Sequence, residues 1–225
     1  MSKKHQTVLT PGQMKELIGA VTEGVPVNLT PEQAQYWIGR KKKLAGELRR
    51  IFFGANTFSD VLSAWENFYK EIFQRKYDFS GIIVPEAEEI FSWAGCIPGE
   101  MENEEAFSGG KLQQKVWKWT SKKLDEVLDL SFGRDARKDN YIVRFRPNVE
   151  ADEDLKNFSA DMIAERKINT STLKERLLLG GFLYWSEKII LDQKTITLCA
   201  GSRYSGGDVP CVSWGVGELF VLWCD

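Results

Sequence analysis

The sequence predicts an α+β fold, with a helical N-terminal region followed by a small, mostly antiparallel sheet and its packed helices. In the first third of the chain, apolar residues recur at helical spacing after two Thr-Pro starts. The last thirty or so residues instead alternate apolar and polar side chains between glycine-bearing turns, as strands do. Helices and strands do not alternate regularly, which argues against a doubly wound sheet.

Composition bounds the class of protein. The chain has 225 residues, 43% of them apolar and 28% charged, which is ordinary for a globular protein. No apolar run reaches the length of a membrane span, and the first residues lack the apolar stretch of a signal peptide. We therefore expect a cytoplasmic protein with no membrane association.

Cysteine and histidine usage excludes several kinds of site. Cys96, Cys199, Cys211 and Cys224 have no CxxC spacing, and His5 is the single histidine. We expect the cysteines to be reduced, buried thiols, and we expect no metal site and no cofactor. Histidine-based catalysis is disfavoured because His5 lies in a polar N-terminal tail.

Charge is distributed unevenly along the chain. Residues 1–76 carry 12 Lys and Arg against 7 Asp and Glu, a net of +5, while residues 77–225 carry 18 against 25, a net of −7. The two sum to the −2 of the whole chain. The asymmetry predicts a helical region over 1–76 and an α+β region over 77–225, either as separate domains or packed as one unit.

Three helices are expected in the first region. Thr10-Pro11 opens the first, and the capping box of Thr30 with Gln33 opens the second, which should run to about Phe53. The third, over 57–74, carries a wide apolar stripe.

A basic face on the second of these helices is a candidate binding surface, formed by Arg40, Lys41, Lys42 and Lys43. Such a face neutralises phosphates in nucleic-acid-binding proteins. The structural alternative is a solvated helix face whose lysine stems cover the core.

The middle of the chain alternates short expected elements: a strand at 79–84, a helix at 86–93, an acidic loop at 95–110, a strand at 115–119, a helix from 120 to about 132, and a strand at 141–146. Arg144 and Arg146 either present guanidinium groups to an anion or pair with the acids that follow. Those acids, which include Asp152, Glu153 and Asp154, suggest either a magnesium site or a helix N-terminus.

The last predicted helix, over 172–185, opens with a capping box of Thr172 and Glu175 and is apolar nearly all round, which predicts burial. Gly180 and Gly181 inside it predict close packing of another backbone. Strands at 195–199, 209–214 and 219–223 follow, and Pro210 predicts an edge strand or a bulge.

The turn between the first two of these strands holds another candidate binding site, made of Ser202, Arg203, Tyr204 and Asp208. Binding residues concentrate on loops held by a rigid scaffold. The alternative is an Arg203–Asp208 ion pair inside the hairpin.

Four stretches together carry a resemblance to a known family: LTPEQAQYWIGRKKKLAGELRRIFFG, NVEADEDLKNFSAD, STLKERLLL and TLCAGSRYSGGDVPCVSW. They resemble a family seen in the genomes of candidate-phylum bacteria, whose mark is a C-terminal LC-x-GSRY…DVP-x-V-x-W motif. That family has no assigned activity. The resemblance implies a bacterial, cytoplasmic protein and carries over no site residue.

The function expected from these features is non-enzymatic binding of a protein or nucleic-acid partner, because no catalytic constellation stands out. The alternative is a metal-dependent phosphoester hydrolase that uses Asp152, Glu153, Asp154 or Asp208.

Overall fold

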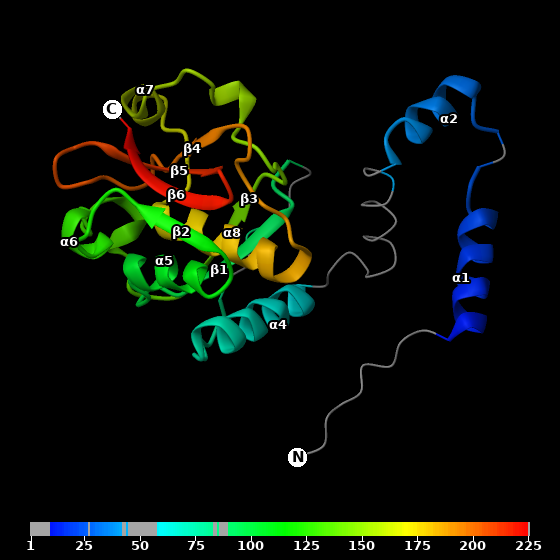
Figure 1. Cartoon of the computed structure of the whole chain (residues 1–225), viewed down its shortest axis with the longest axis horizontal. Helices are drawn as coiled ribbons and strands as arrows, with labels where there is room; N and C mark the ends of the chain where they lie inside the picture. The colour runs from blue at the N-terminus through cyan, green and yellow to red at the C-terminus, as the bar shows by residue number, and fades with distance from the viewer. Residues whose placement is uncertain are drawn as a thin grey trace, which may run out of the picture. The chain divides into compact units, whose positions relative to one another are not determined.

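The computed structural model describes residues 10–26, 28–41, 44, 58–82, 85 and 90–224. The chain divides into two compact units, Met1–Asn56 and Thr57–Asp225 (Figure 1).

The first unit contains helices α1 (Pro11–Glu23) and α2 (Pro31–Ile38). Both begin as predicted, because Thr10 with Gln13 and Thr30 with Gln33 form complete capping boxes. Helix α2 ends earlier than expected, with Gly39 as its C-cap. Residues 42–43 and 45–53 of the expected helix lie outside the described residues. Neither α1 nor α2 contains a buried residue.

The second unit begins with α4 (Phe58–Phe68), which continues into one wider turn, η1 (Tyr69–Phe73). Trp65, Phe68 and Tyr69 of this segment are fully buried in the main core. The segment therefore belongs to the second unit, and the division falls before α4 rather than at the expected 76/77. In the strand expected at 79–84, the described residues 79–82 form a turn instead.

Two sheets form the rest of the framework, as the α+β prediction requires. Strands β1 (Trp93–Ile97) and β3 (Tyr141–Phe145) pair antiparallel. The larger sheet has the order β2-β6-β5-β4, with bounds Lys115–Lys118, Glu218–Cys224, Val209–Gly215 and Ile196–Leu198. Strand β2 runs parallel to β6, and the other neighbours are antiparallel.

The acidic loop expected at 95–110 is wrong. That stretch holds β1 and helix α5 (Asn103–Lys111). Ala106 and Phe107 of α5 are buried in the core, and a side chain at Gly109 would collide with the ring of Phe73. Of the helix expected at 86–93, residues 86–89 lie outside the described residues, and Trp93 opens β1.

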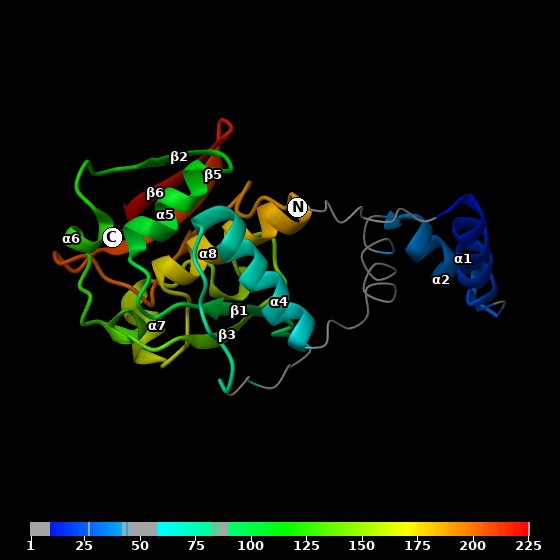
Figure 2. The same ribbon diagram turned by 90° about the horizontal axis from the view of Figure 1, so that it is seen from below.

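Helix α8 (Leu173–Glu187) lies in the middle of this unit, where it contacts α4, α5, β1 and β5 (Figure 2). Its capping box of Thr172 and Glu175 is formed as predicted. Its glycines adjoin side chains and not another backbone. A Cβ at Gly180 would lie 2.5 Å from the Arg176 guanidinium, and one at Gly181 would lie 3.3 Å from the Phe68 ring.

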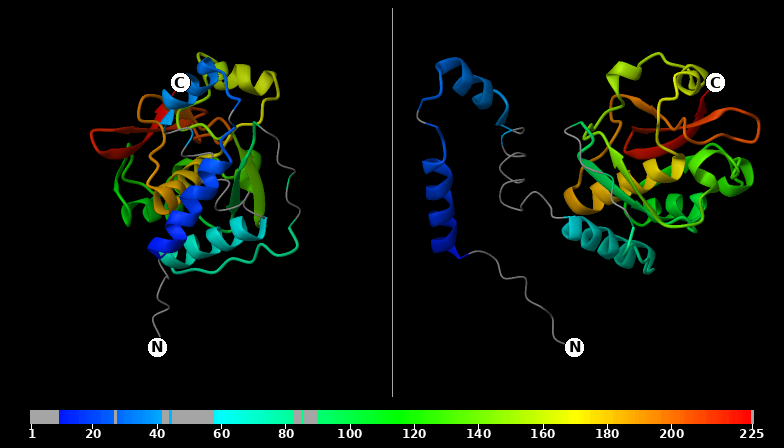
Figure 3. Two further views of the ribbon diagram at one scale, coloured as in Figure 1. Left: turned by 90° about the vertical axis from the view of Figure 1, so that its right-hand side faces the viewer. Right: turned by 180° about the vertical axis from the view of Figure 1, so that it is seen from behind.

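Short helices complete the unit: α6 (Leu124–Val127), η2 (Gly133–Ala136), η3 (Glu153–Leu155) and α7 (Ala160–Glu165). The segment 146–171, which we call the arm, leaves β3, carries η3 and α7, and returns to the start of α8 (Figures 1 and 3).

Pro210 does not mark an edge strand, because β5 lies between β6 and β4. Its carbonyl accepts a hydrogen bond from the Cys199 N–H at 2.8 Å, one residue beyond the end of β4. Since proline has no N–H to return this bond, the β4–β5 pairing stops where Pro210 stands.

The β5–β6 hairpin turns through two residues with positive φ, Val216 at 49° and Gly217 at 82°. Positive φ at both positions is the pattern of a type I′ turn, which favours Asn-Gly. A β-branched residue is strained there, and Val216 is fully exposed, so its side chain adds no packing.

We predict that Val216→Asn stabilises the protein by about 0.5–1 kcal/mol, because asparagine tolerates left-handed backbone. Urea unfolding followed by fluorescence should show a higher midpoint with an unchanged slope. Val216→Thr, which stays β-branched, should leave the midpoint where it is. An unchanged midpoint for Val216→Asn would contradict the strain at this turn.

Candidate functional site

The second unit contains a cleft of about 1020 Å³. Residues 141–146, which are β3 and the residue that follows it, form one wall of the cleft. Residues 195–198, which are β4 and the residue that precedes it, form another. The arm and the first turns of α8 complete the lining.

The floor of the cleft contains a buried carboxylate, Glu175 of α8, with no exposed side-chain surface. Arg134 donates to both of its oxygens, from Nε at 2.7 Å and from Nη2 at 2.8 Å. The Tyr141 hydroxyl donates to the same carboxylate at 2.8 Å. Burial raises the pKa of Tyr141, so the phenol stays protonated as a donor.

A second buried ion pair lies beside the first. Arg176 donates from Nε and Nη2 to Oδ2 of Asp192, at 3.0 and 2.6 Å. Only 4% and 2% of the two side chains are exposed. The Thr197 hydroxyl of β4 donates to the other oxygen of Asp192 at 2.9 Å. The pair therefore ties α8 to β4.

Behind the floor, two further charged groups are buried around the start of α8. Lys174 donates to the carbonyls of Gly99 and Met101, both at 3.1 Å, and burial lowers its pKa. Asp135 accepts from the Ser202 hydroxyl at 2.5 Å, and Ser202 accepts from the Leu173 N–H. Burial raises the pKa of Asp135 to about 6, and its Oδ1 has no hydrogen-bond partner among the described residues.

The acids of the arm serve structural contacts. Arg146 pairs with Asp152 at 3.3 Å and with Asp154 at 2.6 Å, the second of the two alternatives that the sequence left open. Glu150 accepts from the Thr195 N–H and hydroxyl and so fastens the arm to the start of β4. Arg144 donates from Nε to the carbonyl of Pro85. Within the described ranges, no group of three or more His, Cys, Asp and Glu side chains is arranged to hold a metal ion.

The structure separates the four residues of the predicted turn site. Ser202 is fully buried against Asp135, and the Arg203 Nη1 donates to the carbonyls of Ala200 and Ser202. Asp208 is exposed, and the described ion pairs do not include the expected Arg203–Asp208 pair.

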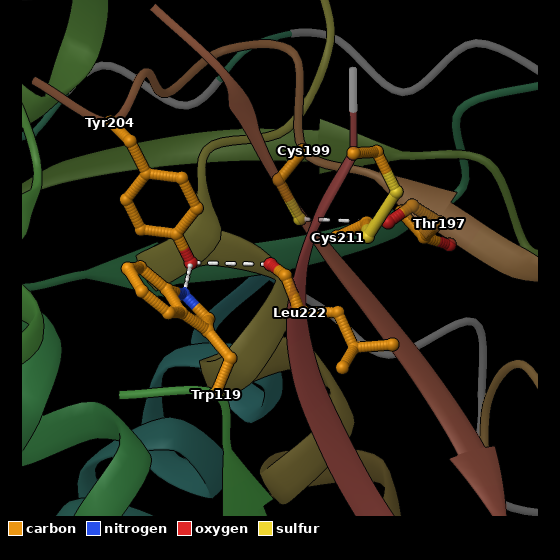
Figure 4. The surroundings of a disulfide bond; sticks show 7 residues. Trp119, Thr197, Cys199, Tyr204, Cys211 and Leu222 are labelled. Atoms are coloured by element: carbon orange, nitrogen blue, oxygen red, sulfur yellow. Dashed lines mark hydrogen bonds between the residues drawn. A yellow bond between two sulfur atoms is a disulfide. The ribbon is translucent and has the colours of Figure 1, made fainter. Parts of the chain in front are cut away.

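Tyr204 is buried with its hydroxyl already engaged. It donates to the Leu222 carbonyl at 3.2 Å and accepts from the Trp119 indole N–H at 2.9 Å (Figure 4). Burial raises its pKa to about 12. Of the turn residues, only Asp208 has a freely accessible charged group, and whether the turn binds a ligand stays a prediction.

Two of the cysteines are joined, which corrects the expectation of four reduced thiols. Cys211 on β5 and Cys224 on β6 form a disulfide, with Cα atoms 6.2 Å apart (Figure 4). The β5–β6 register pairs Val209 with Cys224, so the two cysteines are diagonal neighbours on one face of the sheet. Cys96 and Cys199 are free, buried thiols, as expected.

The basic face predicted on the second helix is only partly described. Arg40 and Lys41 are exposed just beyond α2, and the Arg40 guanidinium lies 4.0 Å from the centre of the Tyr36 ring. Lys42 and Lys43 lie outside the described residues. Its role in nucleic-acid binding stays a prediction.

The sequence did not indicate that the residues of the cleft floor form a site, although Glu175 was predicted as the acid of a capping box. Arg134, Glu175, Arg176 and Asp192 come from three separate stretches of the chain. One signal was present: residues 174–176 are charged, yet they begin a helix whose remaining turns are apolar nearly all round. Consecutive charges on a buried helix require partners, so they point to an internal ion-pair network.

Comparison of the chain with protein-family models, curated proteins and solved structures finds no match. The part of the chain that the structure describes contains no helix with the length and apolar character needed to cross a membrane.

We predict strong coupling between Arg176 and Asp192. Arg176→Met and Asp192→Asn should each lower the free energy of unfolding by about 3–5 kcal/mol, because each leaves the partner buried without its counter-charge or full set of bonds. The double variant should cost much less than their sum, as measured by chemical denaturation. The exposed pair of Lys156 and Glu153 is the control, and its cycle should give about 0–1 kcal/mol. Additive losses at Arg176 and Asp192 would contradict the pairing.

We predict a pH-dependent effect of Asp135→Asn. The folded pKa of about 6 lies above the usual 3.8, so protonation of Asp135 favours folding below pH 4, and this stability is lost as pH rises through 6. The asparagine variant should therefore gain stability relative to wild type as pH rises from 4 to 7, in urea unfolding at each pH. A difference that is constant over this range would refute the raised pKa.

Proposed function

We propose that this protein acts by binding, and that its partner occupies the cleft between β3 and β4. The observation that carries the proposal is the size of the cleft, about 1020 Å³. Ligand sites typically range from about 300 to 1000 Å³ and combine apolar walls with a few polar groups. Here Phe145 and Leu191 supply apolar surface beside the two ion pairs of the floor.

The charges of the cleft favour a protein partner over a nucleic acid. Among the described residues, its lining holds six cationic side chains and five carboxylates: Arg134, Arg137, Arg144, Arg146, Lys156 and Arg176 against Glu150, Asp152, Glu153, Glu175 and Asp192. Five of the six arginines and lysines form ion pairs with carboxylates: Arg134, Arg137, Arg146, Lys156 and Arg176. A nucleic-acid interface instead concentrates unpaired cations, because phosphate neutralisation dominates its affinity.

Chemistry by carboxylates has less support in the same region. Asp152 and Asp154 are held by Arg146, and Glu150 is held by Thr195. With the pair of Glu153 and Lys156, these contacts occupy three of the four acids of the hydrolase alternative, and the fourth, Asp208, does not line the cleft, so we propose binding rather than hydrolysis.

To test this proposal, the full chain is screened against two random libraries, one of linear peptides displayed on phage and one of single-stranded RNA. Enriched ligands are then measured by isothermal titration against wild type, a double variant with Val149→Arg and Ile196→Arg, and the control Val216→Arg. Val149 and Ile196 line the cleft and are 38% and 53% exposed, so their replacement changes the cleft without emptying the core. Val216 is exposed at the hairpin tip outside the cleft.

We expect peptides to be enriched, and to bind wild type and Val216→Arg equally but the double variant at least about tenfold more weakly. Equal binding of all enriched ligands to the double variant would contradict the cleft as the site. Enrichment of RNA that depends on Arg40 and Lys41 would instead assign binding to the basic face.

A further inference from the structure

We infer that the partner presents a short extended stretch of polypeptide, which adds as a strand to the free edge of β4 inside the cleft. This inference rests on the proposed function and names the kind of partner that the cleft takes. It depends on which backbone groups of the two strand edges are already paired.

Strand β4 lies at the edge of the four-stranded sheet, with β5 on one side only. Cys199 donates its N–H to Pro210, which fixes the alternation of the antiparallel pair. Thr197 then faces β5, while Ile196 and Leu198 direct their N–H and C=O groups away from it. No hydrogen bond to these groups is found among the described residues.

Strand β3, on another wall of the cleft, also has backbone groups that point away from its neighbouring strand. On its neighbour β1, the carbonyls of Ala94 and Cys96 accept from the side chains of α4 and η1, at 2.9 and 2.6 Å, and so point away from β3. Their register partners on β3 are Arg144 and Ile142. By the alternation of an antiparallel pair, these two residues direct their backbone groups away from β1.

The other two sheet edges are protected, in contrast to β3 and β4. The outer edge of β1 is covered by the Trp65 indole N–H and the Tyr69 hydroxyl. Strand β2, at the far edge of the large sheet, carries Lys115 and Lys118, and lysine on an edge discourages pairing with another chain. Strand β4 carries Ile196, Thr197 and Leu198 and no charge.

The open stretch of β4 is short and bounded at both ends. Before it, Thr195 is fastened to the arm through Glu150 and through the Ala151 N–H. After it, the Gly201 N–H donates to the Ser171 carbonyl. Between these contacts lie the three residues of β4, about 10 Å at roughly 3.3 Å per residue. The site therefore pairs with about three residues of the partner.

The two faces of β4 predict the side chains of that stretch. Ile196 and Leu198 lie on one face, where Leu198 packs against the small buried cluster of Ala160, Ile163, Ala200 and Val209. Thr197 lies on the other, bonded to Asp192 beside Arg176. Paired residues of neighbouring strands place their side chains on the same face of the sheet. The three residues of the added strand should therefore be apolar, polar and apolar, in that order.

A polypeptide is the occupant that these groups recognise best. Backbone donors and acceptors that repeat every second residue match another extended backbone, as in strand addition. The matched groups are the N–H and C=O of Ile196 and Leu198.

The experiment uses the full chain and the peptides enriched from the phage library. Each peptide is made in two further forms, with N-methyl groups on one or the other set of alternate amides. Ile196→Pro removes one free N–H and keeps the β5 pairing, since proline is tolerated on an edge strand when its nitrogen faces outward. Ile196→Val keeps the N–H and is the matched control.

We expect one N-methylated form to lose at least about tenfold in affinity and the other to bind nearly as before, because only alternate amides face β4. Ile196→Pro should weaken binding by about tenfold, and Ile196→Val by less than about twofold. Thermal unfolding of both variants checks that the sheet is intact.

Each contrary result has its own meaning. Peptides that bind the cleft equally in all forms, and equally to Ile196→Pro, would overturn strand addition and leave the proposed function standing. If no peptide binds the cleft, both are overturned. Concentration-dependent dimers of the protein alone that Ile196→Pro abolishes would replace the partner with a second copy of this chain, and would overturn the inference as stated.

Discussion

The structure depends on the burial of three consecutive charged residues, Lys174, Glu175 and Arg176, in the first turn of α8. A buried charge is tolerated only when it is paired and hydrogen-bonded. Glu175 and Arg176 are ion-paired, whereas Lys174 is held by hydrogen bonds to two backbone carbonyls, and each of the three finds its partners in a different part of the chain. Lys174 reaches the carbonyls at 99 and 101, Glu175 reaches Arg134 and Tyr141, and Arg176 reaches Asp192. One helical turn thus fixes the position of three separate loops.

The same contacts shape the cleft. The two ion pairs form its floor, and the backbone of Asp192 also bonds the arm and β5. Its N–H donates to the Val149 carbonyl of the arm, and its carbonyl accepts from the Trp214 N–H of β5. The arm, β5 and α8 therefore meet at Asp192, and β3 and β4 line the same cleft as the two ion pairs.

Much of the fold followed from local sequence signals. The predicted helix starts at Thr10, Thr30 and Thr172 all form, and β2 and β3 lie where period-2 patterns placed them. Signals of this kind act over a few residues, so sequence alone suffices to identify them.

Features that depend on distant partners were harder to predict. Helix α5 buries the side chains of Ala106 and Phe107, and its Gly109 lies against the ring of Phe73. In the sequence this apolar stripe is too sparse to indicate a buried helix beside the run of glutamates. The disulfide of Cys211 and Cys224 depends on the register of two strands, which spacing does not determine. The cleft floor likewise combines residues from three stretches of the chain. The one sequence signal for it was the charge of residues 174–176 at the start of a helix that is predicted to be buried.

The free edge of β4 is the feature on which partner binding depends, and amide hydrogen exchange measured by NMR tests it most directly. In the protein alone, the amides of Ile196 and Leu198 should exchange rapidly, while the Thr197 amide between them, bonded to β5, should be protected. Slow exchange at Ile196 and Leu198 equal to that at Thr197 would show that the edge is already paired, and would contradict the account.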